Sequence, residues 1–123
     1  MNYAFARNQY ARSKQAALSN ISDPHEMILL TLRELTRSLA LLDAPNLGAA
    51  KRKNHFSKAF TAIYILQTSL DFEAGSEIAQ NLFKIYEYCR DQLLLALKGS
   101  SDHDLKSCIT IVNDIIDAWE QIK

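Results

Sequence analysis

Glycine and proline, the residues that most often interrupt regular structure, are scarce in this chain. Its 123 residues include three glycines and two prolines. An all-β protein needs many turns, and turns depend on these residues, so the shortage counts against a sandwich or a barrel. Leu, Ala, Ile, Lys, Gln and Glu are abundant instead and favour helices. The length fits one domain with a single core.

Excess charge and long apolar runs are also missing. The 14 basic and 14 acidic side chains cancel, and the one basic cluster, at 51–53, is expected to be a solvated patch. This balance counts against a general electrostatic contact with nucleic acid. The sequence has no run near the roughly 18 apolar residues of a membrane span, and no apolar core of a signal peptide. We therefore expect a cytoplasmic protein with no membrane insertion.

Sequence motifs for catalysis and metal binding are lacking too. Cys89 and Cys108 do not have CxxC spacing and lie on apolar helical stripes, so buried free thiols are expected. We find no glycine-rich phosphate loop, no HExxH, no GxSxG and no Glu-x-x-His of a di-iron bundle. The sequence therefore predicts no cofactor, no metal and no enzymatic activity.

Four long segments have helical periodicity. The first begins at 22–26, where a cap residue precedes a proline at the first helical position, and it is expected to end at Ala44, before Pro45. We expect the second helix to begin at Asn46. The fourth begins after the stop and cap at 98–102.

The stretch 69–82 joins the second and third helices. Gly75 suits a sharp reversal, so we expect a helix, a tight turn and a second helix in this stretch. Asp71 is expected at the end of the preceding helix, and the third helix is expected to begin at Ser76. Four helices joined by short loops predict an all-α fold, an antiparallel up-down four-helix bundle with an additional N-terminal arm or short helix. The predicted units are the arm at 1–21 and the bundle at 22–123.

The third helix carries more apolar surface than one bundle face needs. One row contains Ile78, Leu82, Ile85, Cys89 and Leu93, and a second row lies beside it. A helix with two apolar rows is either central in a bundle or covered by a partner. A homodimer through the second row is one interpretation.

A second interpretation concerns His55 and Lys58. Their spacing resembles the His-x-x-Lys-Gly core of histidine phosphotransfer domains, in which an exposed imidazole is phosphorylated and a lysine one turn later neutralises the phosphoryl charge. Ala59 stands where glycine is expected. The simpler interpretation is a surface histidine beside the core residue Phe56.

The stretch 69–88 is similar to the signature of the FliS family of flagellar export chaperones. That signature reads Ser-Leu-Asp, then Gly-Gly/Ser-Glu-Ile/Leu-Ala-x-Asn-Leu, then Leu-Tyr-x-Tyr. The start at 22–25 resembles the family's Ala-Ser-Pro, Tyr10 resembles an aromatic of its N-terminal arm, and 117–119 resembles its terminal Ala-Trp. The sequence departs from the family at 31–35, where Met-Leu-Tyr/Phe-Asp-Gly is usual.

The resemblance implies a cytoplasmic, non-enzymatic chaperone. Its implied partner is flagellin, whose disordered C-terminal segment becomes helical on the bundle. The resemblance implies that the chaperone prevents premature polymerisation of flagellin and aids its delivery to the flagellar type III export apparatus, whose components are further candidate partners. An apolar groove would hold such amphipathic helices. We name eight candidate groove residues: Tyr10, Leu66, Leu70, Ile78, Leu82, Ile85, Tyr86 and Leu93. Tyr86 is expected at a wet edge because its hydroxyl needs a partner. Tyr3, Phe5 and Tyr10 are candidates to cover the empty groove.

Overall fold

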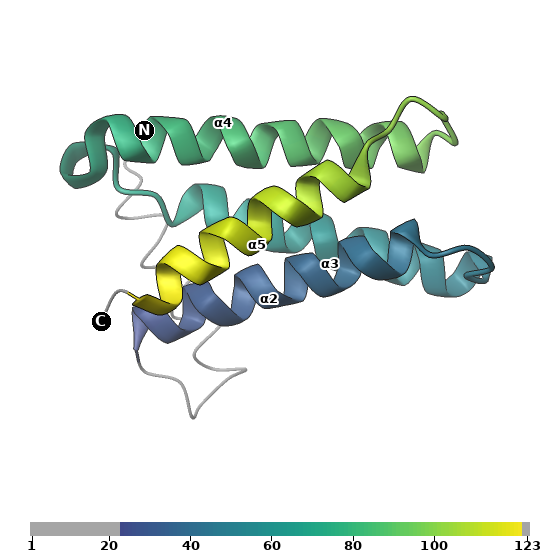
Figure 1. The fold of residues 1–123 in the computed structure, drawn as a ribbon, viewed down its shortest axis with the longest axis horizontal. Helices are drawn as coiled ribbons and strands as arrows, with labels where there is room; N and C mark the ends of the chain where they lie inside the picture. The colour runs from purple at the N-terminus through teal and green to yellow at the C-terminus, as the bar shows by residue number, and fades with distance from the viewer. Residues whose placement is uncertain (1–22, 122–123) are drawn as a thin grey trace.

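The computed structural model describes residues 23–121, which form an all-α bundle (Figure 1). The predicted all-α fold is confirmed. The arm at 1–21, with Tyr10, lies outside the described residues. Four helices make up the described part: α2 (Pro24–Asp43), α3 (Ala49–Thr68), α4 (Phe72–Leu97) and α5 (Leu105–Gln121).

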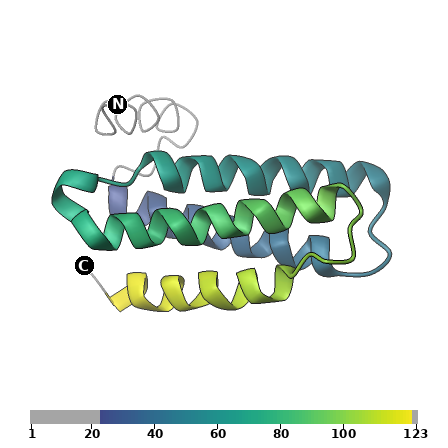
Figure 2. The ribbon, with the colours of Figure 1, turned by 90° about the horizontal axis from the view of Figure 1, so that it is seen from above.

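Successive helices run in opposite directions and close into a ring. Each helix packs on the next one along the chain, and α5 also packs on α2, whereas the diagonal pairs have few or no contacts. Figure 2 shows the same arrangement, with α4 between α3 and α5. This is the up-down topology that short loops impose on consecutive helices.

The core is formed by one stripe from each helix. The stripe of α2 consists of Leu32, Leu35, Leu39 and Leu42, which are all buried and recur every three or four residues. The stripes of the other three helices join them in one cluster, which holds both cysteines as free thiols. The predicted buried thiols are therefore confirmed.

The predicted start of α2 is correct, and the predicted start of α3 is wrong. The Asp23 carboxylate accepts a hydrogen bond from the backbone N–H of His25, at 3.0 Å, and Pro24 follows it. Asn46, expected to begin the second long helix, instead has φ 69° in the connection, and α3 begins after Gly48. Asparagine tolerates this left-handed conformation, so it serves the turn after Pro45.

The turn before α4 lies further towards the N-terminus than the sequence indicated. Asp71, not Ser76, caps the helix: its carboxylate accepts hydrogen bonds from the N–H groups of Glu73 and Ala74, both at 3.0 Å. Ser76 interrupts the helix with φ 46° and ψ −116°. Gly75 has another role, because a Cβ there would lie 3.0 Å from that of Ala79. Residues 72–75 thus form one helical turn capped by Asp71, and the kink at Ser76 separates this turn from the long part of α4 (Figures 1 and 2).

The last connection behaves as predicted at its start. Gly99 has φ 77° and ends α4. The cap of α5 is Asp104, whose carboxylate accepts from the N–H of Ser107 at 3.0 Å. The backbone N–H of Asp104 in turn donates to the side chain of Gln92 at 2.8 Å, which ties the loop to α4.

The opposite end of α5 is held against the start of α2. The indole N–H of Trp119 donates to the carbonyl of His25 at 3.0 Å, and His25 Nε2 lies 2.8 Å from the carbonyl oxygen of Trp119. The two rings stack with centroids 5.2 Å apart. An exposed ion pair between Arg33 and Glu120 lies nearby and contributes little on its own. These contacts close the ring of helices.

Candidate partner-binding surface

Helix α4 is packed differently at its two ends. Its C-terminal half lies close to α5, whereas its N-terminal half diverges from α5, which crosses towards α2 (Figure 1). The contacts of Gln92 with Asp104 and of Trp119 with His25 fix these two ends of α5. The C-terminal half of α4 therefore lies nearer to α5 than the N-terminal half does (Figure 1).

Three predicted groove residues lie in the core. Leu66 and Leu93 are fully buried, and Tyr86 is 3% exposed. The expectation that Tyr86 lies at a wet edge is wrong. Burial, with a smaller contribution from Cys89, raises the pKa of the Tyr86 phenol well above its usual range. In this conformation the three side chains support the surface from below and do not form it.

The remaining predicted residues lie nearer the surface. Ile78 is 71% exposed, directly after the kink at Ser76. Leu70, Leu82 and Ile85 are half-buried, and Leu70 and Leu82 pack against the edge of the core. One exposed and three half-buried members of the predicted set therefore lie between residues 70 and 85, from the connection before α4 to the middle of that helix.

A groove also lies between α3 and the C-terminal half of α4. It has a volume of about 450 Å³, and it is lined by Phe60, Ile63, Tyr64, Gln67, Arg90 and Leu94. The amide of Gln67 donates to the carboxylate of Glu87 at 2.8 Å, and Glu87 pairs with Arg90 at 3.4 Å. The groove thus has apolar walls and a hydrogen-bonded polar rim. Tyr64 is 57% exposed.

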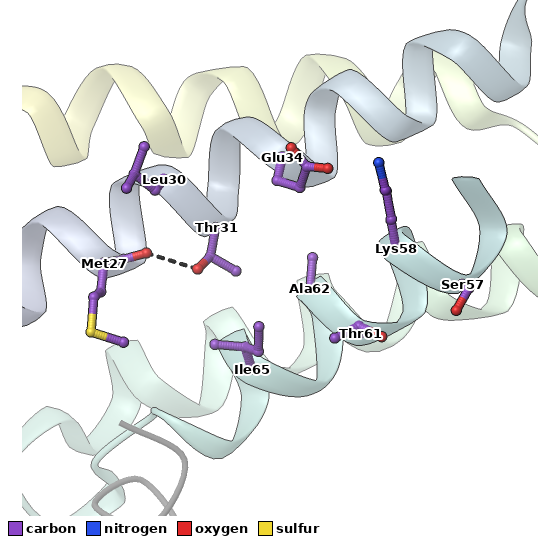
Figure 3. Close-up of a pocket in the computed structure, with 9 residues that line it drawn as sticks. All are labelled: Met27, Leu30, Thr31, Glu34, Ser57, Lys58, Thr61, Ala62 and Ile65. Atoms are coloured by element: carbon purple, nitrogen blue, oxygen red, sulfur yellow. Dashed lines mark hydrogen bonds between the residues drawn. The ribbon is translucent and has the colours of Figure 1, made fainter. Parts of the chain in front are cut away.

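A second groove lies between α2 and α3 and was not predicted. Figure 3 shows Met27, Leu30 and Ile65 at one end and Glu34 and Lys58 at the other. Its volume is about 420 Å³. The hydroxyl of Thr31 forms a hydrogen bond within α2, because it donates to the backbone carbonyl of Met27 at 2.7 Å. The sequence signal for this groove was the widening of the apolar stripe at the start of α2, by Met27 and Leu30.

His55 is half-buried on α3, one turn before Lys58. Its Nδ1 is enclosed and has no hydrogen-bond partner in the described part of the chain. Lys58 is exposed and lines the α2–α3 groove (Figure 3). Phosphotransfer at His55 stays an untested hypothesis.

Residues 23–121 contain no group of three or more His, Cys, Asp or Glu side chains placed to hold a metal ion. None of their helices is long and apolar enough to cross a membrane.

The fold and its surface define a class: an all-α antiparallel bundle whose residues 23–121 carry open, partly apolar grooves between α2 and α3 and between α3 and α4. Residues 6–123 match the family model described as flagellar protein FliS. The chain belongs to the FliS family, and the resemblance of its sequence motifs is confirmed.

Two curated relatives agree with this assignment. The chain is 26% identical over 105 residues to the flagellar secretion chaperone FliS of Vibrio cholerae serotype O1, covering 82% of this chain and 76% of the relative. It is 28% identical over 118 residues to the protein of the same name from Salmonella typhimurium, covering 92% and 86%. No solved structure gives a significant match.

Proposed function

We propose that this protein is a cytoplasmic export chaperone that binds the C-terminal segment of flagellin. In this role it prevents premature polymerisation of the client and aids its delivery to the flagellar type III export apparatus. The observation that carries the proposal is the family match over residues 6–123. The two relatives carry the name flagellar secretion chaperone. No catalytic activity is part of the proposal.

The surface of the bundle supports this role physically. A disordered client loses conformational entropy when it folds on its chaperone, so it needs a large apolar contact to bind. The two grooves and the exposed side chains of Leu30, Tyr64 and Ile78 offer apolar surface on three helices. An amphipathic helix binds such a surface through apolar residues three or four positions apart.

We place the main contact at the start of α4 and along the α3–α4 groove. Ile78, Leu82, Ile85 and Leu70 form its predicted apolar surface. The proposed role of the three buried residues is indirect: their packing in the core keeps α3 and α4 in the relative position that forms this surface. These residues are Leu66, Tyr86 and Leu93. Tyr10 and the rest of the arm are proposed to cover the empty groove.

The test of the client is co-purification of the full chain with flagellin and with flagellin truncated at its C-terminus. Truncation is expected to abolish capture. Equal capture of intact and truncated flagellin contradicts the proposal.

Two matched variants locate the contact. Ile78→Ala and Leu97→Ala each shorten an exposed aliphatic side chain of α4, at 71% and 53% exposure, at opposite ends of the helix. Ile78→Ala is expected to weaken flagellin binding about tenfold, a typical loss for one well-packed contact. Leu97→Ala is expected to bind like the unchanged protein. Equal effects of the two variants contradict the placement at the start of α4.

Deletion of residues 1–18 tests the covering role of the arm. It is expected to tighten flagellin binding or to promote self-association, because it exposes an apolar surface. Light scattering with and without the client separates a homodimer from a client complex. Unchanged affinity together with an unchanged oligomeric state contradicts this role.

A further inference from the structure

The first turn of α4 is folded back towards the rest of the helix. Residues 72–75 form this turn, and Ser76 joins it to the long part of α4 with φ 46° and ψ −116° (Figure 2). The rings of Phe72 and Phe83 meet edge to face, with centroids 6.0 Å apart. In a straight α-helix these two residues would lie about 16 Å apart along the axis, at 1.5 Å per residue. The contact between the rings therefore depends on the kink.

Two neighbouring residues have opposite effects on this kink. A Cβ at Gly75 would lie 3.0 Å from the Cβ of Ala79, so the kinked form has room for glycine alone at this position. In a straight helix, Cβ atoms four residues apart are about 6 Å apart, so an alanine fits there. Ser76, in contrast, has a backbone conformation that favours glycine. Gly75 thus permits the kink and Ser76 strains it, so the straight form of α4 is a close competitor.

The folded-back turn is held together by its own hydrogen bonds. The Asp71 carboxylate accepts from the N–H groups of Glu73 and Ala74, and the Asp71 carbonyl accepts from the N–H of Gly75 at 2.7 Å. These bonds join residues of the turn to each other and to its cap. The turn can therefore move as one unit about Ser76 without losing them.

The ring of Phe83 lies near one end of the α3–α4 groove. Gln67 lines this groove, and its side-chain nitrogen donates to the backbone carbonyl of Phe83 at 3.5 Å. We propose that residues 72–75 are a lid on this end of the groove, hinged at Ser76. In the closed form Phe72 covers Phe83. In the open form the turn continues the axis of α4, and Phe83 extends the apolar wall of the groove.

The lid regulates binding of an amphipathic helix, which places an apolar side chain where the ring of Phe72 lies in the closed form. This regulatory role rests on the proposed function. A protein whose competent form is a minor population binds with an affinity reduced by that fraction. The position of the lid therefore sets how tightly the groove binds its client.

Two substitutions move the lid in opposite directions. Gly75→Ala favours the open form, because a Cβ does not fit the closed one and alanine favours a continuous helix. Ser76→Gly favours the closed form, because it removes the strain at the hinge. Both positions lie at the start of α4, so the pair is matched in place and differs in direction.

Nuclear magnetic resonance of the full-length protein tests the hinge without a client. Overhauser contacts between the rings of Phe72 and Phe83 are expected in the unchanged protein and in Ser76→Gly, and are expected to be lost in Gly75→Ala. An unchanged indole N–H resonance of Trp119 shows that the bundle is intact. Ring contacts that persist in Gly75→Ala, or that are missing in the unchanged protein, overturn the proposal.

Relaxation dispersion gives a second measurement that does not depend on the folding of Gly75→Ala. Residues 72–78 of the unchanged protein are expected to show exchange on the microsecond-to-millisecond scale, and Ser76→Gly is expected to reduce it. Equal exchange in the two proteins, or none in the unchanged protein, contradicts the hinge.

Flagellin titrations test the regulatory role. Gly75→Ala is expected to bind about threefold or more tightly than the unchanged protein, and Ser76→Gly about threefold or more weakly. If the ring contacts respond as expected but both variants bind flagellin with unchanged affinity, the lid does not control binding. If flagellin binds to none of the three proteins, the proposed chaperone function fails, while the resonance measurements still decide the hinge.

Discussion

The two halves of α4 have the same apolar periodicity but different surroundings. Cys89, Leu93 and Ala96 in the C-terminal half are buried in the core, whereas Ile78 in the N-terminal half is largely exposed. The kink at Ser76 sets residues 72–75 apart from the rest of α4, and α5 follows an oblique path across the bundle (Figures 1 and 2). The comparison shows that an apolar stripe identifies surface that prefers to be covered, and that tertiary packing decides whether the protein itself covers it.

The largest expected difference between the halves is in stability. Leu93→Ala removes a fully buried side chain and is expected to lower the free energy of unfolding by about 2–5 kcal/mol. Ile78→Ala, the matched aliphatic substitution in the exposed half, is expected to change it by less than about 0.5 kcal/mol. Urea denaturation followed by circular dichroism measures both. Similar losses in the two variants show that Ile78 is covered in solution.

The free energy of unfolding is also expected to depend on pH in the alkaline range, through Tyr86 in the C-terminal half of α4. Burial raises the pKa of Tyr86 above its ordinary value of 10.0, so the neutral phenol is favoured in the folded state. Its contribution is complete below pH 10 and is lost as the pH rises further, at about 1.4 kcal/mol per pH unit. Tyr86→Phe is expected to flatten stability measured by urea denaturation from pH 9 to 11. An equally steep loss in Tyr86→Phe contradicts the assignment to this residue.

At the N-terminal end of α4, the stability of the first helical turn is expected to depend on Asp71. Asp71→Ala removes the acceptor for two backbone N–H groups and is expected to cost about 1 kcal/mol. Because the kink separates 72–75 from the rest of α4, faster amide exchange is expected there and not at Leu93. Asp71→Asn keeps an acceptor and serves as the control. Faster exchange throughout α4 shows that the two halves are one cooperative unit.

The smallest expected effect is a gain in stability at the kink. Ser76 has φ 46° and ψ −116°, a conformation that costs a residue with a Cβ more than it costs glycine. Ser76→Gly is expected to raise the free energy of unfolding by up to about 1 kcal/mol, after the larger entropy of the unfolded glycine chain is subtracted. Thermal unfolding measures the change. If Ser76→Gly instead lowers the free energy of unfolding by a similar amount, as glycine does inside a regular helix, the kink is absent in solution.

Local signals predicted the elements well. Asp23 and Pro24 at the start of α2, and Gly99 at the end of α4, act within one turn of the chain, and each has the predicted role. The boundary before α4 was wrong because Asp71 and Ser76 are both good cap residues and Gly75 lies between them. Packing of Phe72 against Phe83, with ring centroids 6.0 Å apart, accompanies the earlier start, and this contact is not visible in a sequence window.

The candidate site was less predictable than the fold. Tyr86 and Ile78 belong to adjacent rows of α4, and nothing in their spacing indicates that one is 3% and the other 71% exposed. The buried stripe of α4 consists of Ala79, Tyr86, Cys89, Leu93 and Ala96, so Ile78 lies one position away from the side that faces the core. Packing against the other helices decides which of the two adjacent rows is buried. The α2–α3 groove was missed for the same reason, because it depends on how Lys58 and Glu34 lie across two helices.

The contact between His25 and Trp119 also has a consequence for the order of folding. It joins residues 94 positions apart, so the face of α2 that receives α5 stays uncovered until α5 has been synthesised. Closing so long a loop is slow relative to pairing α2 with α3. We therefore expect the α2–α3 hairpin to collapse first and α5 to dock late. Trp119 is the single tryptophan of the chain, so its fluorescence in refolding experiments reports this last step directly.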